Sequence, residues 1–208
     1  MSTPEPLIRP PLQRRSQESL ERVLQAGFEL LKDEGFEGFT LQAVSKRAGV
    51  SIGSIYARVP SREALIMAIY ERVTAWTEED QISPRSTRDG LPARERIEML
   101  VSELAGQMLT HGSDLRVFMR QAAVNPDIWQ RGAEKSQATA QVFRRAVLEH
   151  PEDVSHPDPE LAIDIGFRMM YCTIARRLTH GPRFESTREV SDEALVAELS
   201  RAIADYLL

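Results

Sequence analysis

Hydroxyl and glycine residues recur at short intervals between positions 40 and 65, which read TLQAVSKRAGVSIGSIYARVPSREAL. Thr40 and Ser51 each precede a short apolar pattern, where a hydroxyl side chain caps the first turn of a helix. Gly49 lies between the two patterns and can take the positive φ that ends a helix. The free amides at a helix N-terminus also bind anions such as phosphate. The spacing predicts two short helices, joined by a tight turn, that suit an anionic partner.

The two predicted helices, 41–47 and 52–58, have the pattern of a helix-turn-helix. Leu41, Val44 and Ala48 recur at the spacing of one buried helix face. Packing on that face leaves the outer side of the second helix free to enter a DNA major groove. The segment therefore predicts a DNA-binding element.

Small side chains on the second helix are candidates for contact with base pairs. Ile52 or Ala57 would touch a thymine methyl group, and Ser54 would hydrogen-bond a base edge. Gly53 lacks a side chain, which allows a close approach to DNA. The two capping hydroxyls would cap in either case, and capping is compatible with a phosphate contact.

The charge distribution places a small basic face on an acidic chain. The net charge is −5, but residues 40–60 contain Lys46, Arg47 and Arg58 and no acidic residue. Lys46 and Arg47 equally fit the pattern of solvated surface charges. An N-terminal arm, 1–15, is basic and proline-rich, with Arg9, Arg14 and Arg15. The arm would either reach a minor groove or remain a disordered terminus.

Other chemistry finds little support in the sequence. The four histidines, His111, His150, His156 and His180, do not have metal-ligand spacing. Cys172 has no histidine near it in the sequence, and neither a phosphate-binding glycine loop nor a nucleophile elbow is present. We therefore expect no enzyme activity, metal or cofactor. One cysteine, no signal peptide and no long apolar run predict a cytoplasmic protein.

The same segment resembles the TetR/AcrR family of bacterial transcriptional regulators over about residues 15–75. The matching positions are Thr40, Ala48, Gly49, Val50, Ser51, Gly53, Ile55, Tyr56, Ser61, Glu63 and Leu65. The departures are Arg58 and Val59 in place of the usual His-Phe pair, and Arg62 in place of the usual lysine.

The resemblance implies a homodimeric regulator, most simply a repressor, that binds an inverted-repeat operator and responds to a small molecule. It also implies that Thr40 and Tyr56 contact phosphates. The complete set of expected DNA contacts is Thr40, Lys46, Arg47, Ser51, Ile52, Gly53, Ser54, Tyr56, Ala57, Arg58 and Arg62.

The rest of the chain predicts an all-α protein with about nine helices, because no window shows sustained period-two alternation. We expect a three-helix DNA-binding domain over residues 1–60. A helical domain for ligand binding and dimerisation would span residues 61–208, with its first helix reaching about residue 79. Residues 82–91 have the composition of a loop.

The penultimate predicted helix, 160–179, is apolar on nearly all sides and must be covered on more than one of them. It would pair with the last helix either inside one large core or across a dimer as a four-helix bundle. The resemblance favours the dimer. The candidate interface residues are Phe167, Met170, Ile174, Leu195, Leu199 and Ile203.

The central helices contain Met and aromatic residues that suit a largely apolar ligand. The candidates are Met99, Leu104, Met108, Phe118, Met119, Trp129, Phe143, Met169 and Tyr171, with Asp164 and Arg168 as polar groups. Residues of these types are more often ordinary core, and the two charged groups would equally pair with each other. The alternative function is a ligand-independent DNA-binding or protein-interaction regulator with a filled core.

Overall fold

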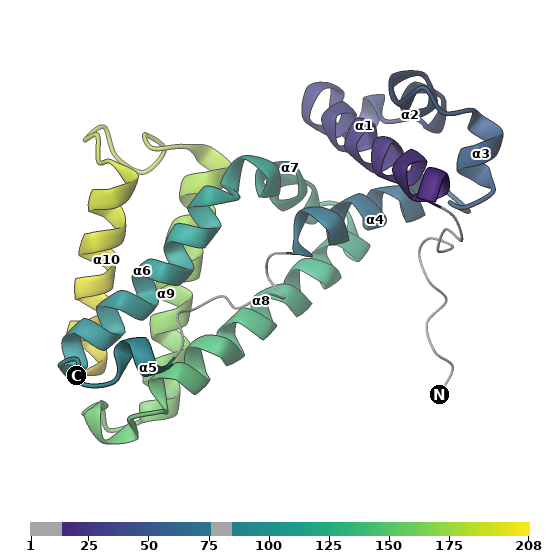
Figure 1. Ribbon diagram of the computed structural model, residues 1–208. Coiled ribbons are helices and arrows are strands. Elements are labelled where there is room, and N and C mark those ends of the chain that lie inside the picture. The colour runs from purple at the N-terminus through teal and green to yellow at the C-terminus, as the bar shows by residue number, and fades with distance from the viewer. Residues whose placement is uncertain (1–13, 76–84) are drawn as a thin grey trace. The chain divides into compact units, whose positions relative to one another are not determined.

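The computed structural model describes residues 14–75 and 85–208, and these residues contain helices and no strands. Contacts along the chain divide it into two compact units, Met1–Ala75 and Trp76–Leu208 (Figure 1). This division lies after the domain boundary expected at residue 60, and it places the fourth helix in the first unit. All nine predicted helices are present.

The first unit contains α1 (Arg14–Gly38), α2 (Leu41–Ala48), α3 (Ile52–Tyr56) and α4 (Arg62–Val73). A break at Gly35, with φ of 70°, interrupts α1. Both α2 and α4 pack against α1. The core between them includes Phe39, Val44, Leu65 and Ile69, each with 0% of its surface exposed. This core holds the two short helices in place.

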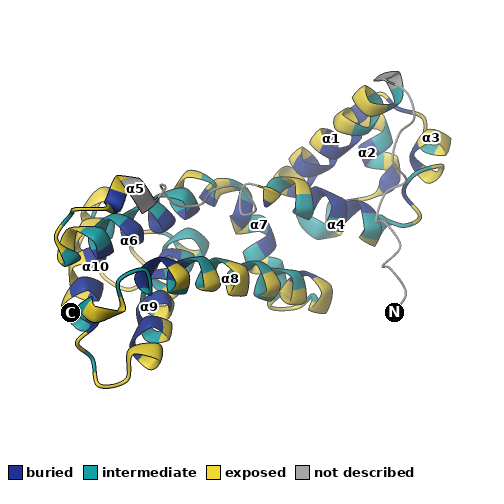
Figure 2. Ribbon diagram, turned by 60° about the horizontal axis from the view of Figure 1, so that its bottom comes forward, coloured by how far each residue is buried: buried dark blue, intermediate teal, exposed yellow. Residues whose placement is uncertain are grey.

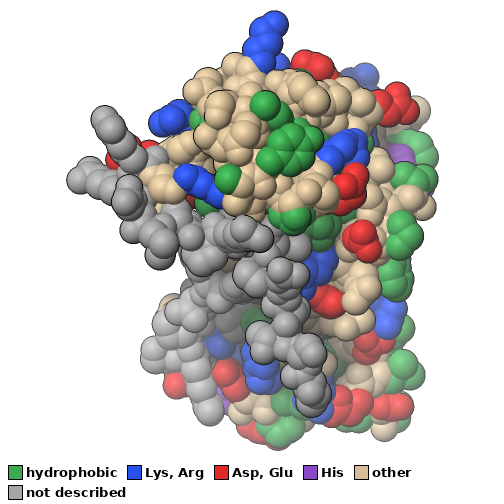
Figure 3. Space-filling view, turned by 90° about the vertical axis from the view of Figure 1, so that its right-hand side faces the viewer, with side chains coloured by type: hydrophobic (Ala, Val, Ile, Leu, Met, Phe, Trp, Pro, Cys, Tyr) green, Lys and Arg blue, Asp and Glu red, His purple; other side chains and the backbone are tan. Residues whose placement is uncertain are grey.

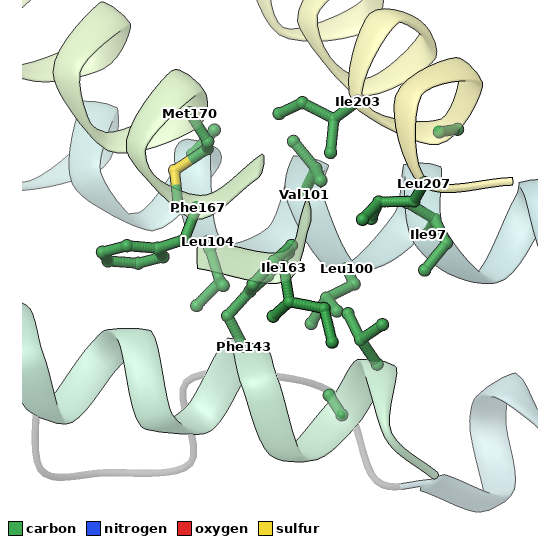
Figure 4. Packing of buried hydrophobic residues seen from close by; sticks show 14 of the residues in the cluster. Ile97, Leu100, Val101, Leu104, Phe143, Ile163, Phe167, Met170, Ile203 and Leu207 are labelled. Carbon is green, nitrogen blue, oxygen red and sulfur yellow. The ribbon is translucent and has the colours of Figure 1, made fainter. Parts of the chain in front are cut away.

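The second unit contains the remaining elements. They are α5 (Arg85–Arg88), α6 (Ala93–Thr110), α7 (Gly112–Ala122), α8 (Pro126–Val147), a 3₁₀-helix (Pro151–Asp153), α9 (Pro159–His180) and α10 (Asp192–Leu207). α6 packs against both α9 and α10, and α9 also contacts α7, α8 and α10. Figure 4 shows apolar side chains of α6, α8, α9 and α10 meeting in one core, in which Val101 and Ile203 are 0% exposed.

Two boundaries differ from the prediction. The fourth helix ends at Val73, because Thr74 has non-helical backbone angles and its hydroxyl donates to the Tyr70 carbonyl at 2.9 Å. The predicted continuation to residue 79 lies largely outside the described residues. The predicted loop at 82–91 contains α5, whose Arg88 is only 4% exposed. None of the helices in the described part of the chain is both long and apolar enough to cross a membrane.

Four of the predicted interface residues belong to the core of a single chain. Phe167, Met170, Ile174 and Ile203 are 6%, 0%, 0% and 0% exposed. The prediction of a partner-facing role for these side chains is wrong, because α6, α8, α9 and α10 of the same chain pack around them. The outer sides of α9 and α10 remain exposed (Figure 2).

Candidate nucleic-acid interface

The helix-turn-helix is held by hydroxyl caps at both helix starts. Thr40 Oγ1 accepts a hydrogen bond from the Ala43 amide at 3.1 Å. Ser51 Oγ accepts one from the Ser54 amide at 3.2 Å. Each cap satisfies an amide that would otherwise lack a partner within its helix. The two predicted caps are therefore present.

The turn between the helices has two further constraints. Gly49 has φ of 64°, a left-handed conformation that a side chain would disfavour. Ser45 Oγ donates to the Val50 carbonyl at 2.7 Å, and the Val50 side chain is 8% exposed. The sequence predicts the role of Gly49, but nothing in it points to the Ser45 bond. Together these contacts fix where α3 begins.

The outer side of α3 is composed of small and polar groups. Gly53, Ser54 and Ala57 are exposed, and Tyr56 is 53% exposed. Ile55, on the opposite side, is 2% exposed and anchors the helix in the core. Figure 3 shows a face of the molecule on which backbone and uncharged polar side chains predominate, with hydrophobic, basic and acidic side chains among them. Such a helix can approach a groove closely.

Ser54 is held in place on this surface. Its hydroxyl lies 2.8 Å from that of Ser51, so one hydroxyl donates to the other. Ile52 is half-buried, which limits its reach compared with the exposed Ala57. The structure thus places Ser54 and Ala57 on the exposed side of α3, with Ser54 in a defined orientation, and turns Ile52 partly toward the interior.

The two cations of α2 have different surroundings. Lys46 is exposed. Arg47 forms ion pairs with α1, at 2.8 Å to Asp33 Oδ2 and 3.8 Å to Glu34 Oε1. The acidic side chains reduce the positive charge that Arg47 presents to an anionic partner. Lys46 is therefore the stronger candidate for a phosphate contact.

Arg58 and Arg62 also bind within the first unit. The Arg58 guanidinium donates to the backbone carbonyl and the hydroxyl of Ser16 in α1. The Arg62 guanidinium donates to the carbonyls of Phe36 and Phe39. Both side chains are oriented by these bonds, which the sequence does not reveal.

The predicted ligand residues do not surround one described pocket. Leu104, Met108, Phe118 and Phe143 are buried in the apolar interior of the second unit, at 2%, 4%, 1% and 0% exposed. Met99, Met119, Met169 and Tyr171 are half-buried. Trp129 is 62% exposed, so the prediction that it lines an interior pocket is wrong.

The predicted polar ligand groups, Asp164 and Arg168, lie on the exposed side of α9. They pair with each other at 2.7 Å, which is the alternative that their spacing allows. Arg168 is 66% exposed and Asp164 51% exposed. An interior ligand would not reach this pair.

A cavity of about 10 Å³ lies elsewhere in the second unit, among Arg88, Leu100, Val147 and Glu149, and its walls include none of the predicted ligand residues. A volume of that order holds about one water molecule. Across the described ranges, no three His, Cys, Asp or Glu side chains gather in a way that could hold a metal.

Tyr171 is a predicted ligand residue whose phenol has a polar partner within the second unit. Burial raises the pKa of its phenol, and a hydrogen bond with Ser136 acts in the opposite direction. Its ring stacks on Phe167 at a centroid distance of 5.6 Å. This phenol provides a polar group between α8 and α9.

Comparison with known proteins agrees with this geometry. Residues 23–69 match the model of the bacterial regulatory proteins of the tetR family. Over these residues the chain is similar to the tetR family. The matched residues include the end of α1, both helices of the helix-turn-helix and most of α4.

Sequence similarity to a known regulator is low over a longer part of the chain. The uncharacterized HTH-type transcriptional regulator YerO of Bacillus subtilis (strain 168) is 21% identical over 133 residues, which are 63% of this chain and 46% of YerO. The chain thus aligns with about half the length of that relative.

Two solved structures show the same fold along nearly the whole chain. A regulatory protein of the tetR family from Rhodococcus RHA1 has a TM-score of 0.64 and 16% identity, covering 91% of this chain and 96% of its own. The regulator FadR of Bacillus subtilis, in complex with stearoyl-CoA, has a TM-score of 0.61 and 15% identity, covering 89% and 95%.

Proposed function

We propose that this protein is a DNA-binding transcriptional regulator of the TetR family that inserts α3 into the major groove of an operator. The observation that carries the proposal is the outer side of α3, where Gly53, Ser54 and Ala57 are exposed while Ile55 holds the helix in the core. Ser54 offers a hydrogen bond to a base edge, and the two small residues permit close approach. Thr40 and Tyr56 are the proposed phosphate contacts.

The proposed active form is a homodimer that binds an inverted repeat. A two-fold dimer presents two copies of α3, which we call the recognition helices, so its operator shares that symmetry. The outer side of α9 supports this form: Leu161 is 49% exposed, and Ile165 and Cys172 follow it along that side. Leu195 and Leu199 of α10 are half-buried, and each has surface left for a partner.

We further propose that the protein is a repressor released by a largely apolar effector. The FadR structure, which shares this fold, is a complex with stearoyl-CoA, and the long acyl chain of that ligand supports an effector with a large apolar part. An effector that binds more tightly to a conformation in which the two recognition helices are wrongly spaced would weaken operator binding. The operator and the effector would each lower the affinity for the other by the same coupling free energy. The shift would pass through α4, the last helix of the first unit.

A second candidate is a regulator that needs no ligand. The close packing of Leu104, Met108 and Phe143 favours it, because each side chain is 4% exposed or less. Close packing around these three side chains leaves little space for an effector beside them. The two candidates share the DNA-binding step and differ only in its control.

Selection of bound sequences from random duplex DNA tests the DNA-binding proposal. We expect an enriched inverted repeat at moderate salt, and light scattering of the protein alone should give the mass of a dimer. If no sequence is enriched, the proposal fails. A thermal-shift screen of long-chain acyl compounds then separates the two candidates. A compound that raises the unfolding temperature and lowers operator affinity supports the effector, whereas a complete lack of hits favours the ligand-independent regulator.

A further inference from the structure

Arg58 connects the end of the recognition helix to the start of α1. It lies two residues after Tyr56, the last residue of α3. Its Nη1 donates to the Ser16 carbonyl at 2.6 Å, and its Nη2 donates to the Ser16 hydroxyl. One guanidinium thus binds two oxygens of a single residue that is 42 positions away in the sequence. The planar, forked geometry of arginine suits this bond pair, and an ammonium group cannot reproduce it.

Arg62 forms a similar link at the other end of α1. Its Nε donates to the Phe39 carbonyl at 2.8 Å, and its Nη2 donates to the Phe36 carbonyl. Its guanidinium also lies 5.8 Å from the centroid of the Phe39 ring, which is fully buried. The Phe36 and Phe39 carbonyls, which follow the break in α1, therefore accept hydrogen bonds from Arg62, the first residue of α4.

The two arginines flank the segment that joins α3 to α4. Between them, the Val59 side chain is only 1% exposed, so its burial also holds the segment in place. Loss of either guanidinium would free one end of α1 from this segment. The angle at which α3 projects from the unit would then be less well defined, even if the core stayed packed.

We propose that Arg58 and Arg62 are positioning residues, which orient the recognition helix through α1 and do not act by binding phosphate. This inference rests on the proposed DNA-binding function. A residue that only orients α3 supports operator binding and contributes little to non-specific affinity. A phosphate contact supports both, and its removal reduces the salt dependence of binding.

Arg58→Lys provides the first test, because lysine keeps the positive charge and loses the forked bond pair. Positioning predicts that Arg58→Lys and Arg58→Ala both lose operator affinity, by on the order of tenfold if each lost charged hydrogen bond has its usual strength. Non-specific duplex affinity and the salt slope of binding should stay at wild-type values. A phosphate contact predicts that Arg58→Lys binds almost normally, and that Arg58→Ala lowers the slope by about 0.9. That second result would overturn the inference.

Ser16→Ala provides an independent test from the partner side, because it removes one of the two acceptors of Arg58. The single variant should weaken operator binding in the same direction. Added to Arg58→Ala, it should have no further effect, because the interaction is already lost. Additive losses would show that Arg58 acts elsewhere and would contradict the inference. This comparison of the single variants with the double variant remains decisive even if an arginine substitution lowers the stability of the first unit.

Arg62→Lys should likewise fail to restore operator binding, since its acceptors are fixed backbone carbonyls. Arg131→Ala is the matched control: it removes an arginine from the surface of α8, where Arg131 pairs with Glu134 at 2.8 Å. Wild-type protein is measured first on operator and on random duplex. If wild type shows no preference for operator, the proposed function fails. If wild type discriminates and Arg62→Lys does so equally well, only the positioning role of Arg62 fails.

Discussion

Gly27 of α1 faces Ile69 of α4 so closely that a Cβ atom on Gly27 would lie 2.6 Å from Ile69 Cδ1. The same Cβ would lie 3.4 Å from the ring of Phe39. Both neighbours are 0% exposed and have little room to move. The absence of a side chain at Gly27 therefore sets the distance between two helices of the DNA-binding unit.

Gly27→Ala is accordingly expected to destabilise the first unit. Gly53→Ala is the matched control, because a Cβ on Gly53 meets no atom within 4 Å. Both substitutions gain helix propensity to a similar degree. We expect Gly27→Ala to be about 1–3 kcal/mol less stable than Gly53→Ala in urea unfolding, as for an overpacked core. Equal stability of the two variants would show that Ile69 moves aside freely.

Gly53→Ala should also separate stability from DNA binding. The substitution adds a methyl group to the exposed outer side of α3 and disturbs no contact within the protein. We expect unchanged or slightly higher stability and weaker operator binding, because the methyl group prevents the closest approach to the groove. Fluorescence anisotropy with labelled operator measures the loss. Unchanged affinity would mean that this side of α3 does not contact DNA closely.

The sequence predicts the first unit well because its signals are local. The caps at Thr40 and Ser51, the glycine turn and the apolar face of α2 each depend on residues within one or two turns. The partners of Arg58 and Arg62 could not be predicted in this way. Their acceptors lie 42 and 23 positions away, and charge alone favoured a surface role.

The second unit shows a different limit. The pattern of α9 correctly indicates a helix covered on several sides, but periodicity does not tell which chain supplies the cover. Phe167 and Met170 are covered by helices of their own chain. Similarly, the loop composition around α5 concealed the buried Arg88, since its partner Glu149 is 61 positions away.

The burial of Met170 leads to a prediction about the dimer. Met170→Glu should unfold the second unit, because Met170 is 0% exposed in an apolar core and the new carboxylate would be buried without a compensating charge. Leu161→Glu should leave the fold intact and weaken the dimer, because Leu161 is 49% exposed on the outer side of α9. Circular dichroism and light scattering distinguish the two outcomes. A folded monomer from Met170→Glu, with Leu161→Glu still dimeric, would place the interface elsewhere.

Arg88 and Glu149 form a pair at 3.1 Å in which the arginine side chain is only 4% exposed. Removing one partner of a buried pair leaves the other charge poorly compensated. We expect Arg88→Met to lower the free energy of unfolding by about 3 kcal/mol. Arg131→Ala, which breaks an exposed pair with Glu134, should cost less than about 1 kcal/mol. Urea unfolding of both variants measures the difference, and equal costs would contradict the buried role of Arg88.

Tyr171 leads to a prediction about alkaline stability. Burial raises the pKa of its phenol above the ordinary value of 10.0, so the folded state favours the neutral form. A raised folded pKa gives stability that is complete below pH 10.0 and is lost as the pH rises through the folded value. Tyr171→Phe removes this titration, so its stability should decline less than that of wild type above pH 10.0. Ser136→Ala should raise the pKa further, because the Ser136 hydrogen bond lowers it. Urea unfolding from about pH 8 to about pH 11, on both sides of the ordinary tyrosine pKa, tests the stability of Tyr171→Phe. Phenolate absorbance tests the pKa of Tyr171 in Ser136→Ala. Identical alkaline profiles for wild type and Tyr171→Phe would show that the phenol ionises without cost to the fold.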